Sequence, residues 1–230
     1  MNTRYLLLVP MVVGLFHLSH AQMKTISLKK GEAVDLLLLT TNKNAAEEQK
    51  EYFSKAVGIA QKWGYKPQYS SKVSLPPTQG NYWPAVFIIA KWEDYDKRIK
   101  FTEDILKEYP QFHERRRIIW PTFNLTYWKV KEDREINIDP DLFYIATSYW
   151  SDEQRAFASF KDDWAQTVKS QGGKIVLEFK DGTSPFGYYY NPEFFTITEW
   201  ESKEAFEKFH EKNQAMDHTG VKHVNQFILQ

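Results

Sequence analysis

The sequence predicts an α+β fold in which one structural unit of roughly 100 residues is used twice. The main observation is an internal repeat. The segment 81–93, NYWPAVFIIAKWE, is similar to the segment 189–201, YYNPEFFTITEWE. Six positions are identical at a fixed offset of 108 residues, and in the first copy they are Tyr82, Pro84, Phe87, Ile89, Trp92 and Glu93. The second observation is that strand and helix patterns follow the same order around both copies. Each copy therefore belongs to one βαββαβ unit.

Each unit is expected to begin with a buried strand followed by a helix. The apolar run Val34–Asn42 has its partner at the same offset in Leu142–Trp150, and such runs without a helical period favour strands covered on both faces. A helix is predicted over residues 44–63, with Asn44 as its cap and Gly64 at its end. In the second unit, Ser151 and Gln154 are expected to form a capping box.

The remaining elements complete the two units. Second strands are expected at residues 67–75 and 174–180, the repeated stretches form the third strands, second helices cover 94–109 and 202–216, and fourth strands cover 122–130 and 223–229. The third strand of the first unit is apolar on both faces. Helices can cover only one of these faces, so we expect the two antiparallel sheets to pack against each other.

The chain divides into four parts. Residues 1–21 have a basic residue, a short apolar run and a small-residue cleavage site, which predicts a secretory signal peptide. Residues 22–130 form the first domain, residues 131–140 a charged and exposed linker, and residues 141–230 the second domain. The protein is therefore expected in the periplasm or outside the cell.

Composition excludes several classes of partner and chemistry. The 30 Lys and Arg residues balance 30 Asp and Glu residues, so no overall charge attracts nucleic acid or an anionic membrane. Cysteine is absent, which excludes disulfides and thiolate nucleophiles. Aromatic residues make up 16% of the chain and must fill the interior or line a cleft. No phosphate-binding loop or serine hydrolase motif is present.

The second half resembles a known enzyme family. Residues 195–224, FTITEWESKEAFEKFHEKNQAMDHTGVKHV, are similar to the W-x-S-x-x-A-F segment of the antibiotic-biosynthesis-monooxygenase family and its haem-degrading relatives. This resemblance implies two tandem ferredoxin-like units, packed as an intramolecular pseudo-dimer of the dimeric α+β barrel superfamily. The family's Asn, Trp and haem-ligating His positions fall on Ser148, Phe209 and His218. Haem is therefore one cofactor that the resemblance implies, and His218 is the best catalytic candidate.

The predicted ligand-binding residues lie in the second half, where polar groups stand among the aromatic ones. They are Trp200, Phe209, Ser148, Tyr190 and Thr198. The favoured alternative is core packing for Trp200 and edge-strand packing for Tyr190. For His218 the favoured alternative is a solvated side chain, and a metal is expected only as haem iron on it.

A basic run, Arg115–Arg117 beside His113, is open to two interpretations. It can meet an anionic ligand, such as a haem propionate or another carboxylate, or it can be a solvated connection, which is the prediction.

Two functions follow. The first is an exported protein that binds a small apolar or aromatic ligand in a cleft between sheet and helices, and this is the prediction. The alternative is a monooxygenase-like enzyme, cofactor-free or haem-using, with His218 as ligand or base. Either can form a homodimer.

Overall fold

Strand β2 (Ala33–Thr40) is the centre of the first unit, because its apolar side chains are buried on both faces. A computed structural model describes residues 23–230 of the chain. In it, β2 lies between β4 (Val86–Trp92) and β5 (Thr122–Lys129), and β3 (Lys66–Lys72) pairs with the free edge of β4. All three pairings are antiparallel. The first βαββαβ unit is thereby confirmed.

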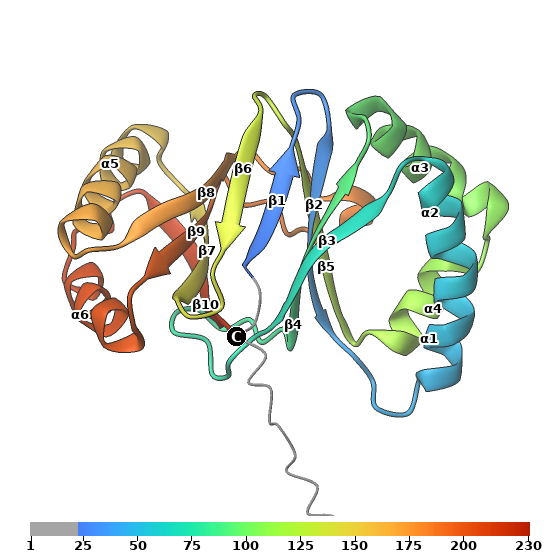
Figure 1. The fold of residues 1–230 in the computed structure, drawn as a ribbon, viewed down its shortest axis with the longest axis horizontal. Helices are drawn as coiled ribbons and strands as arrows, with labels where there is room; N and C mark the ends of the chain where they lie inside the picture. The colour runs from blue at the N-terminus through green and yellow to red at the C-terminus, as the bar shows by residue number, and fades with distance from the viewer. Residues whose placement is uncertain (1–22) are drawn as a thin grey trace, which may run out of the picture.

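Helices cover one face of this sheet (Figure 1). The first is made of α1 (Ala46–Tyr52) and α2 (Gly58–Lys62), joined by a π-helical turn, η1 (Phe53–Val57). Helix α3 (Tyr95–Glu108) follows β4. A further helix, α4 (Phe112–Ile119), contains the basic run, so the expectation of a solvated connection there is wrong.

The second unit has the same plan. Its strands are β7 (Phe143–Ser151), β8 (Lys174–Lys180), β9 (Phe194–Trp200) and β10 (Val221–Leu229), in the antiparallel order β10-β7-β9-β8. Helices α5 (Gln154–Ser170) and α6 (Lys203–Gln214) cover its outer face. A single 3₁₀ turn, η2 (Pro185–Gly187), lies in the loop between β8 and β9.

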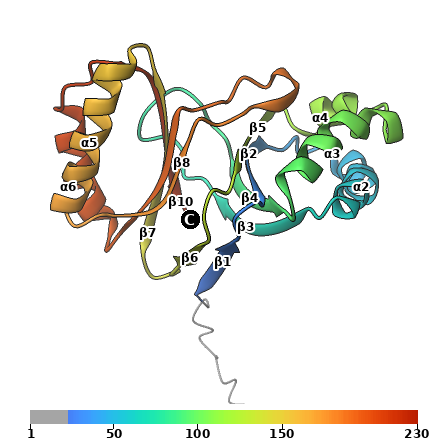
Figure 2. The ribbon, with the colours of Figure 1, turned by 90° about the horizontal axis from the view of Figure 1, so that it is seen from above.

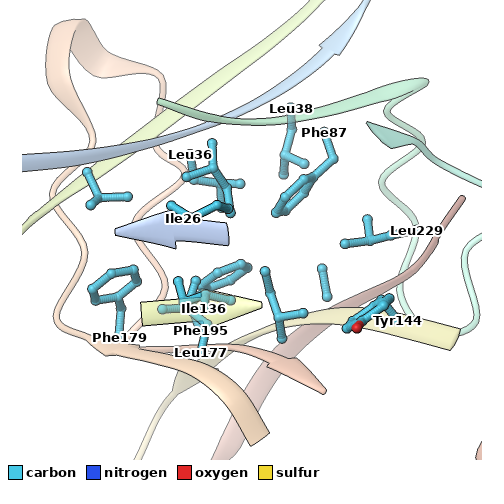
Figure 3. Packing of buried hydrophobic residues seen from close by; sticks show 14 of the residues in the cluster. Ile26, Leu36, Leu38, Phe87, Ile136, Tyr144, Leu177, Phe179, Phe195 and Leu229 are labelled. Atoms are coloured by element: carbon cyan, nitrogen blue, oxygen red, sulfur yellow. The ribbon is translucent and has the colours of Figure 1, made fainter. Parts of the chain in front are cut away.

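The two sheets face each other, with all helices on the outside (Figures 1 and 2). Figure 3 shows the shared core, in which Phe87 of β4 and Phe195 of β9 stack with ring centroids 6.4 Å apart. Trp128 of β5 packs on Phe195 at 5.5 Å. The predicted face-to-face packing of the two sheets is therefore confirmed, and one apolar core joins both halves.

A third, two-stranded sheet lies beside this core. Strand β1 (Lys24–Leu28) pairs with β6 (Arg134–Ile138), which lies inside the expected linker 131–140. Ile136 is buried between the sheets together with Ile26 (Figure 3). Ile138 belongs to the same buried cluster. The linker is thus not a purely exposed connection, because its alternating apolar residues form a strand once β1 is beside it.

Two expected helix caps are wrong. The first helix begins at Ala46 without a side-chain cap, and Asn44 instead donates its backbone N–H to the Asn42 side chain. Helix α5 is capped by Glu153, whose carboxylate accepts from the backbone N–H groups of Arg155 and Ala156, while Gln154 Nε2 donates to Ser151 Oγ. A carboxylate closer to the first turn provides the stronger acceptor for a helix N-terminus.

The repeat offset also changes within the units. Leu36 pairs with Ile89 in the first sheet, whereas Ala146 pairs with Ile197 in the second. With β4 and β9 matched at 108 residues, β2 and β7 therefore match at 110 residues. The expected offset of 108 for the first strands is wrong by two residues, which preserves the face of every side chain because strands have a period of two.

Within residues 23–230, none of the helices combines the length and the apolar character needed to cross a membrane. The expected signal peptide, residues 1–21, lies outside the described residues. Export of the protein stays a prediction.

Candidate functional site

A cavity of about 200 Å³ lies between the first sheet and its helices. Its floor is the helix-facing side of the sheet, including Leu37 and Leu39 of β2 and Ile88 of β4. Its roof includes Ala56 and Ala60 of the first helix. Mostly apolar walls with few polar groups are typical of sites for small organic molecules.

The cavity exists because small side chains stand where the second unit has large ones. At the offset of 108, Ala56 corresponds to Trp164, and Val86 corresponds to Phe194. In the second unit Trp164 is fully buried and packs on Phe194 and Tyr149, at 5.7 and 5.9 Å between ring centroids. The same space is therefore filled in one unit and open in the other.

The π-helical turn η1 forms part of the cavity wall. Phe53, Ala56 and Val57 from this turn all line the cavity. Phe53 is 47% exposed, which places its ring at the outer edge. Because π-turns inside α-helices are frequent at functional sites, this irregularity supports the assignment of the cavity as a site.

A buried ion pair lines the cavity on the side of helix α3. Arg98 is fully buried, and its Nε lies 2.8 Å from Asp35 Oδ1 on β2. The guanidinium also lies over the rings of Tyr127 and Trp92, 4.6 and 5.0 Å from their centroids. Its Nη2 has no hydrogen-bond partner among the described residues. Arg98 thus has an unused donor beside the cavity.

A second buried arginine, Arg116 of α4, lines the cavity near Trp120 and Phe123. Its Nε donates to the Tyr52 hydroxyl at 2.7 Å and its Nη1 to the Tyr188 hydroxyl at 3.0 Å. The guanidinium carbon lies 3.8 Å from the ring centroid of Phe112. Burial raises the pKa of Tyr52, although Arg116 opposes this, so the phenol stays neutral at ordinary pH.

Tyr188 comes from the other half of the chain. The loop between β8 and β9 crosses to the first unit (Figure 2). There Phe186 packs on His113 with ring centroids 4.7 Å apart. Phe186 has a φ of 57°, a conformation that is unusual for a bulky residue. Burial lowers the pKa of His113, and the charges of Arg116 and Arg117 lower it further. The second unit thus helps to hold Arg116 in place.

The predicted site residues Trp200, Phe209 and Thr198 come together, but in a packed core. Trp200 is 1% exposed, its ring lies 4.8 Å from that of Phe209, and its Nε1 donates to Thr198 Oγ1 at 2.9 Å. A Cβ added at Gly173 would lie 2.5 Å from the Trp200 ring. These residues do not line the cavity of the first unit, and their role in ligand binding stays a prediction.

Ser148 and Tyr190 lie on the opposite face of the second sheet. The Tyr190 hydroxyl donates to Ser148 Oγ at 3.0 Å, and both side chains are buried. The ring of Tyr190 packs edge-on against Trp150 and lines an open polar cleft of about 560 Å³. The structure therefore splits the five predicted ligand residues between two faces of one sheet.

His218 lies beyond α6, where its Nδ1 is 2.9 Å from the Met216 carbonyl and its ring packs on Phe160 at 5.2 Å. The helix-facing side of this sheet is filled by Trp164, Phe194 and Phe209. This packing does not fit a haem, because a macrocycle needs an open slot beside its ligand. Within residues 23–230, no group of three or more His, Asp or Glu side chains is placed to hold a metal ion.

Sequence reasoning missed most residues of the cavity. Asp35 lies inside an apolar run and Arg98 on a predicted helix, and neither belongs to a recognisable sequence motif. One available signal was the change from Trp164 to Ala56 between the two copies, since a buried aromatic position replaced by alanine leaves space.

Comparison with known proteins shows the fold. A variant of chlorite dismutase from Candidatus Nitrospira defluvii is similar with a TM-score of 0.51 and 10% identity, over 88% of this chain and 93% of that chain. An anthrone oxidase-like protein is similar with a TM-score of 0.44 and 16% identity, over 90% and 94% of the two chains. No protein-family model and no curated protein matches the sequence. The expected dimeric α+β barrel fold is confirmed.

Proposed function

We propose that this chain, which has the dimeric α+β barrel fold with both units on one polypeptide, binds a flat apolar small molecule in the cavity of its first unit. The observation that carries the proposal is the cavity itself, whose lining includes an alanine and a valine at positions where the second unit has aromatic residues. An empty apolar cavity of this size costs stability, because its walls lose packing contacts. A ligand that fills the space recovers them.

The shape of the cavity supports a flat ligand. It lies between a β-sheet floor and a helical roof, with Trp120 and Phe123 among its walls. Planar aromatic molecules pack well against such rings and against the sides of a sheet. We therefore expect a molecule with one or two fused rings rather than a long flexible chain.

Binding of the neutral probe 2-acetylnaphthalene, measured by isothermal titration calorimetry, tests this proposal. We expect saturable binding by the wild type. Ala56→Trp, which copies the second unit, should weaken the affinity by at least about tenfold, because the indole occupies the site. Ala158→Trp on the exposed surface of α5 is the matched control and should bind as the wild type does.

Ala60→Val, which copies Val168, is a smaller filling change in case Ala56→Trp does not fold. Circular dichroism establishes the fold of each variant. Absence of saturable binding by the wild type, or unchanged binding by a folded variant with the cavity filled, contradicts the proposal.

A further inference from the structure

We propose that the ligand of this cavity carries a carboxylate that pairs with Arg116, so that the site selects aromatic acids over neutral aromatic molecules. This inference rests on the proposed function and adds the chemical class of the ligand. It is carried by the burial of Arg116, by its partners and by the contrast with Arg98.

Arg116 is a buried cation without an anionic partner among the described residues. Only 7% of the residue is exposed, and its hydrogen-bond partners are the hydroxyls of Tyr52 and Tyr188. The nearby carboxylate of Glu51 is engaged instead by Lys55 and Arg115, at 2.7 and 3.3 Å. Phenol oxygens and ring faces solvate a guanidinium but do not neutralise it.

A buried charge of this kind is costly unless a counter-charge is supplied. The rings of Phe112 and Phe123, 3.8 and 4.2 Å from the guanidinium carbon, offset part of that cost. An anion that enters the cavity would provide the remaining interaction. Because the surroundings are apolar, the attraction would be stronger than at the protein surface.

Arg98 lines the same cavity but, unlike Arg116, has a carboxylate partner. Asp35 Oδ1 lies 2.8 Å from Arg98 Nε and neutralises the charge of the guanidinium, so Arg98 needs no second anion. Its unpartnered Nη2 can still donate a hydrogen bond to a neutral oxygen, such as a carbonyl or a hydroxyl group. The two arginines would therefore bind different parts of the ligand. Arg116 would pair with its negative charge, and Arg98 would donate a hydrogen bond to a neutral polar substituent.

A carboxylate is the anion that suits the geometry. A guanidinium presents its N–H groups in a plane that matches the two oxygens of a carboxylate. Tyr52 and Tyr188 accept one N–H each, from Nε and Nη1 of Arg116, which leaves the second N–H of Nη1 and both N–H groups of Nη2 for the two oxygens of a carboxylate. The aromatic body of the same ligand then lies under Ala56 and Ala60.

Arg116 has a second role that the test must separate from ligand binding. It joins α4 to the loop between β8 and β9 through Tyr188, so its removal also weakens a contact between the two units. A purely structural arginine would alter stability and leave the preference between charged and neutral ligands unchanged.

The experiment compares 2-naphthoate with the neutral 2-acetylnaphthalene by calorimetry at pH 7.5 and low salt. We expect the wild type to prefer the acid by about tenfold or more. Arg116→Met, which keeps an unbranched apolar side chain, should reduce this preference to about unity and change the affinity for the neutral probe by less than about twofold. Arg117→Met, at the exposed neighbouring position, is the matched control and should keep the full preference.

Arg116→Lys keeps the positive charge but lacks the planar guanidinium with its paired N–H donors. It is the variant to test if Arg116→Met does not fold. It should keep about threefold preference for the acid. Equal binding of both probes by the wild type overturns this inference and leaves the proposed function intact. A preference that survives in folded Arg116→Met also overturns it, whereas failure of both probes to bind overturns both proposals.

Discussion

At the scale of single residues, the Asp35 and Arg98 pair places a buried ion pair in the wall of the cavity. Both side chains are almost completely removed from solvent, and their hydrogen bond spans β2 and α3. Charges in such surroundings are tolerated only as a pair, because each alone would lose its hydration without compensation.

Asp35→Ala should therefore destabilise the protein by about 3–5 kcal/mol, since Arg98 would remain buried and unpaired. The double variant Asp35→Leu with Arg98→Met removes both charges and should recover most of that loss. Urea unfolding followed by tryptophan fluorescence gives the free energies. A double variant as unstable as the single one would show that shape, not charge, governs this position.

At the scale of elements, the two glycines that end the first helix of each unit allow the two units to be compared at equivalent positions. Gly64 and Gly172 follow helices of equal length and have φ values of 84° and 85°. Only a residue without a Cβ adopts this conformation at little cost. Their surroundings differ, because a Cβ at Gly64 would lie 2.5 Å from Glu93 Cβ, whereas the space around Gly172 is open.

We expect Gly172→Ala to cost about 1 kcal/mol from backbone conformation alone. Gly64→Ala should cost about 1–3 kcal/mol more, because the first helix must also shift away from Glu93. Thermal and urea unfolding of the two variants measure the difference. Equal losses at both positions would mean that the connection between β4 and α3, which contains Glu93, moves aside without strain.

At the scale of the whole molecule, one core serves both halves. Side chains from β4, β5 and β9 meet between the sheets, and the β1–β6 ribbon adds its own apolar residues to them. Neither sheet could expose this inner face to water without losing a large apolar contribution to stability. The two units should consequently unfold together.

Phe87→Ala in the first unit should lower the free energy of unfolding by about 3–5 kcal/mol. Because the core is shared, the slowest-exchanging backbone amides of β2 and β7 should lose protection by the same amount. Hydrogen exchange followed by NMR tests this. Unchanged protection in β7 would show that the second unit is stable by itself.

Local patterns allowed most elements to be predicted. Strand periodicity and helix-ending glycines are read within about a dozen residues, so the order βαββαβ appears twice without any structure. Apart from the two helix caps, errors occurred where a distant segment decides the local structure. Ile136 and Ile138 form a strand only because β1 lies beside them, and α4 is held by contacts with Tyr52 and Tyr188.

The sequence by itself determined the repeated unit, the two sheets and the exclusion of cysteine chemistry, because these depend on residue type and spacing. Only the tertiary structure decided where the cavity lies and which charges are buried beside it. A cavity is space left between segments far apart in the chain, such as Ala56 and Val86, so its volume depends on packing. Arg116 is buried for the same reason, since its phenol partners stand 64 and 72 residues away.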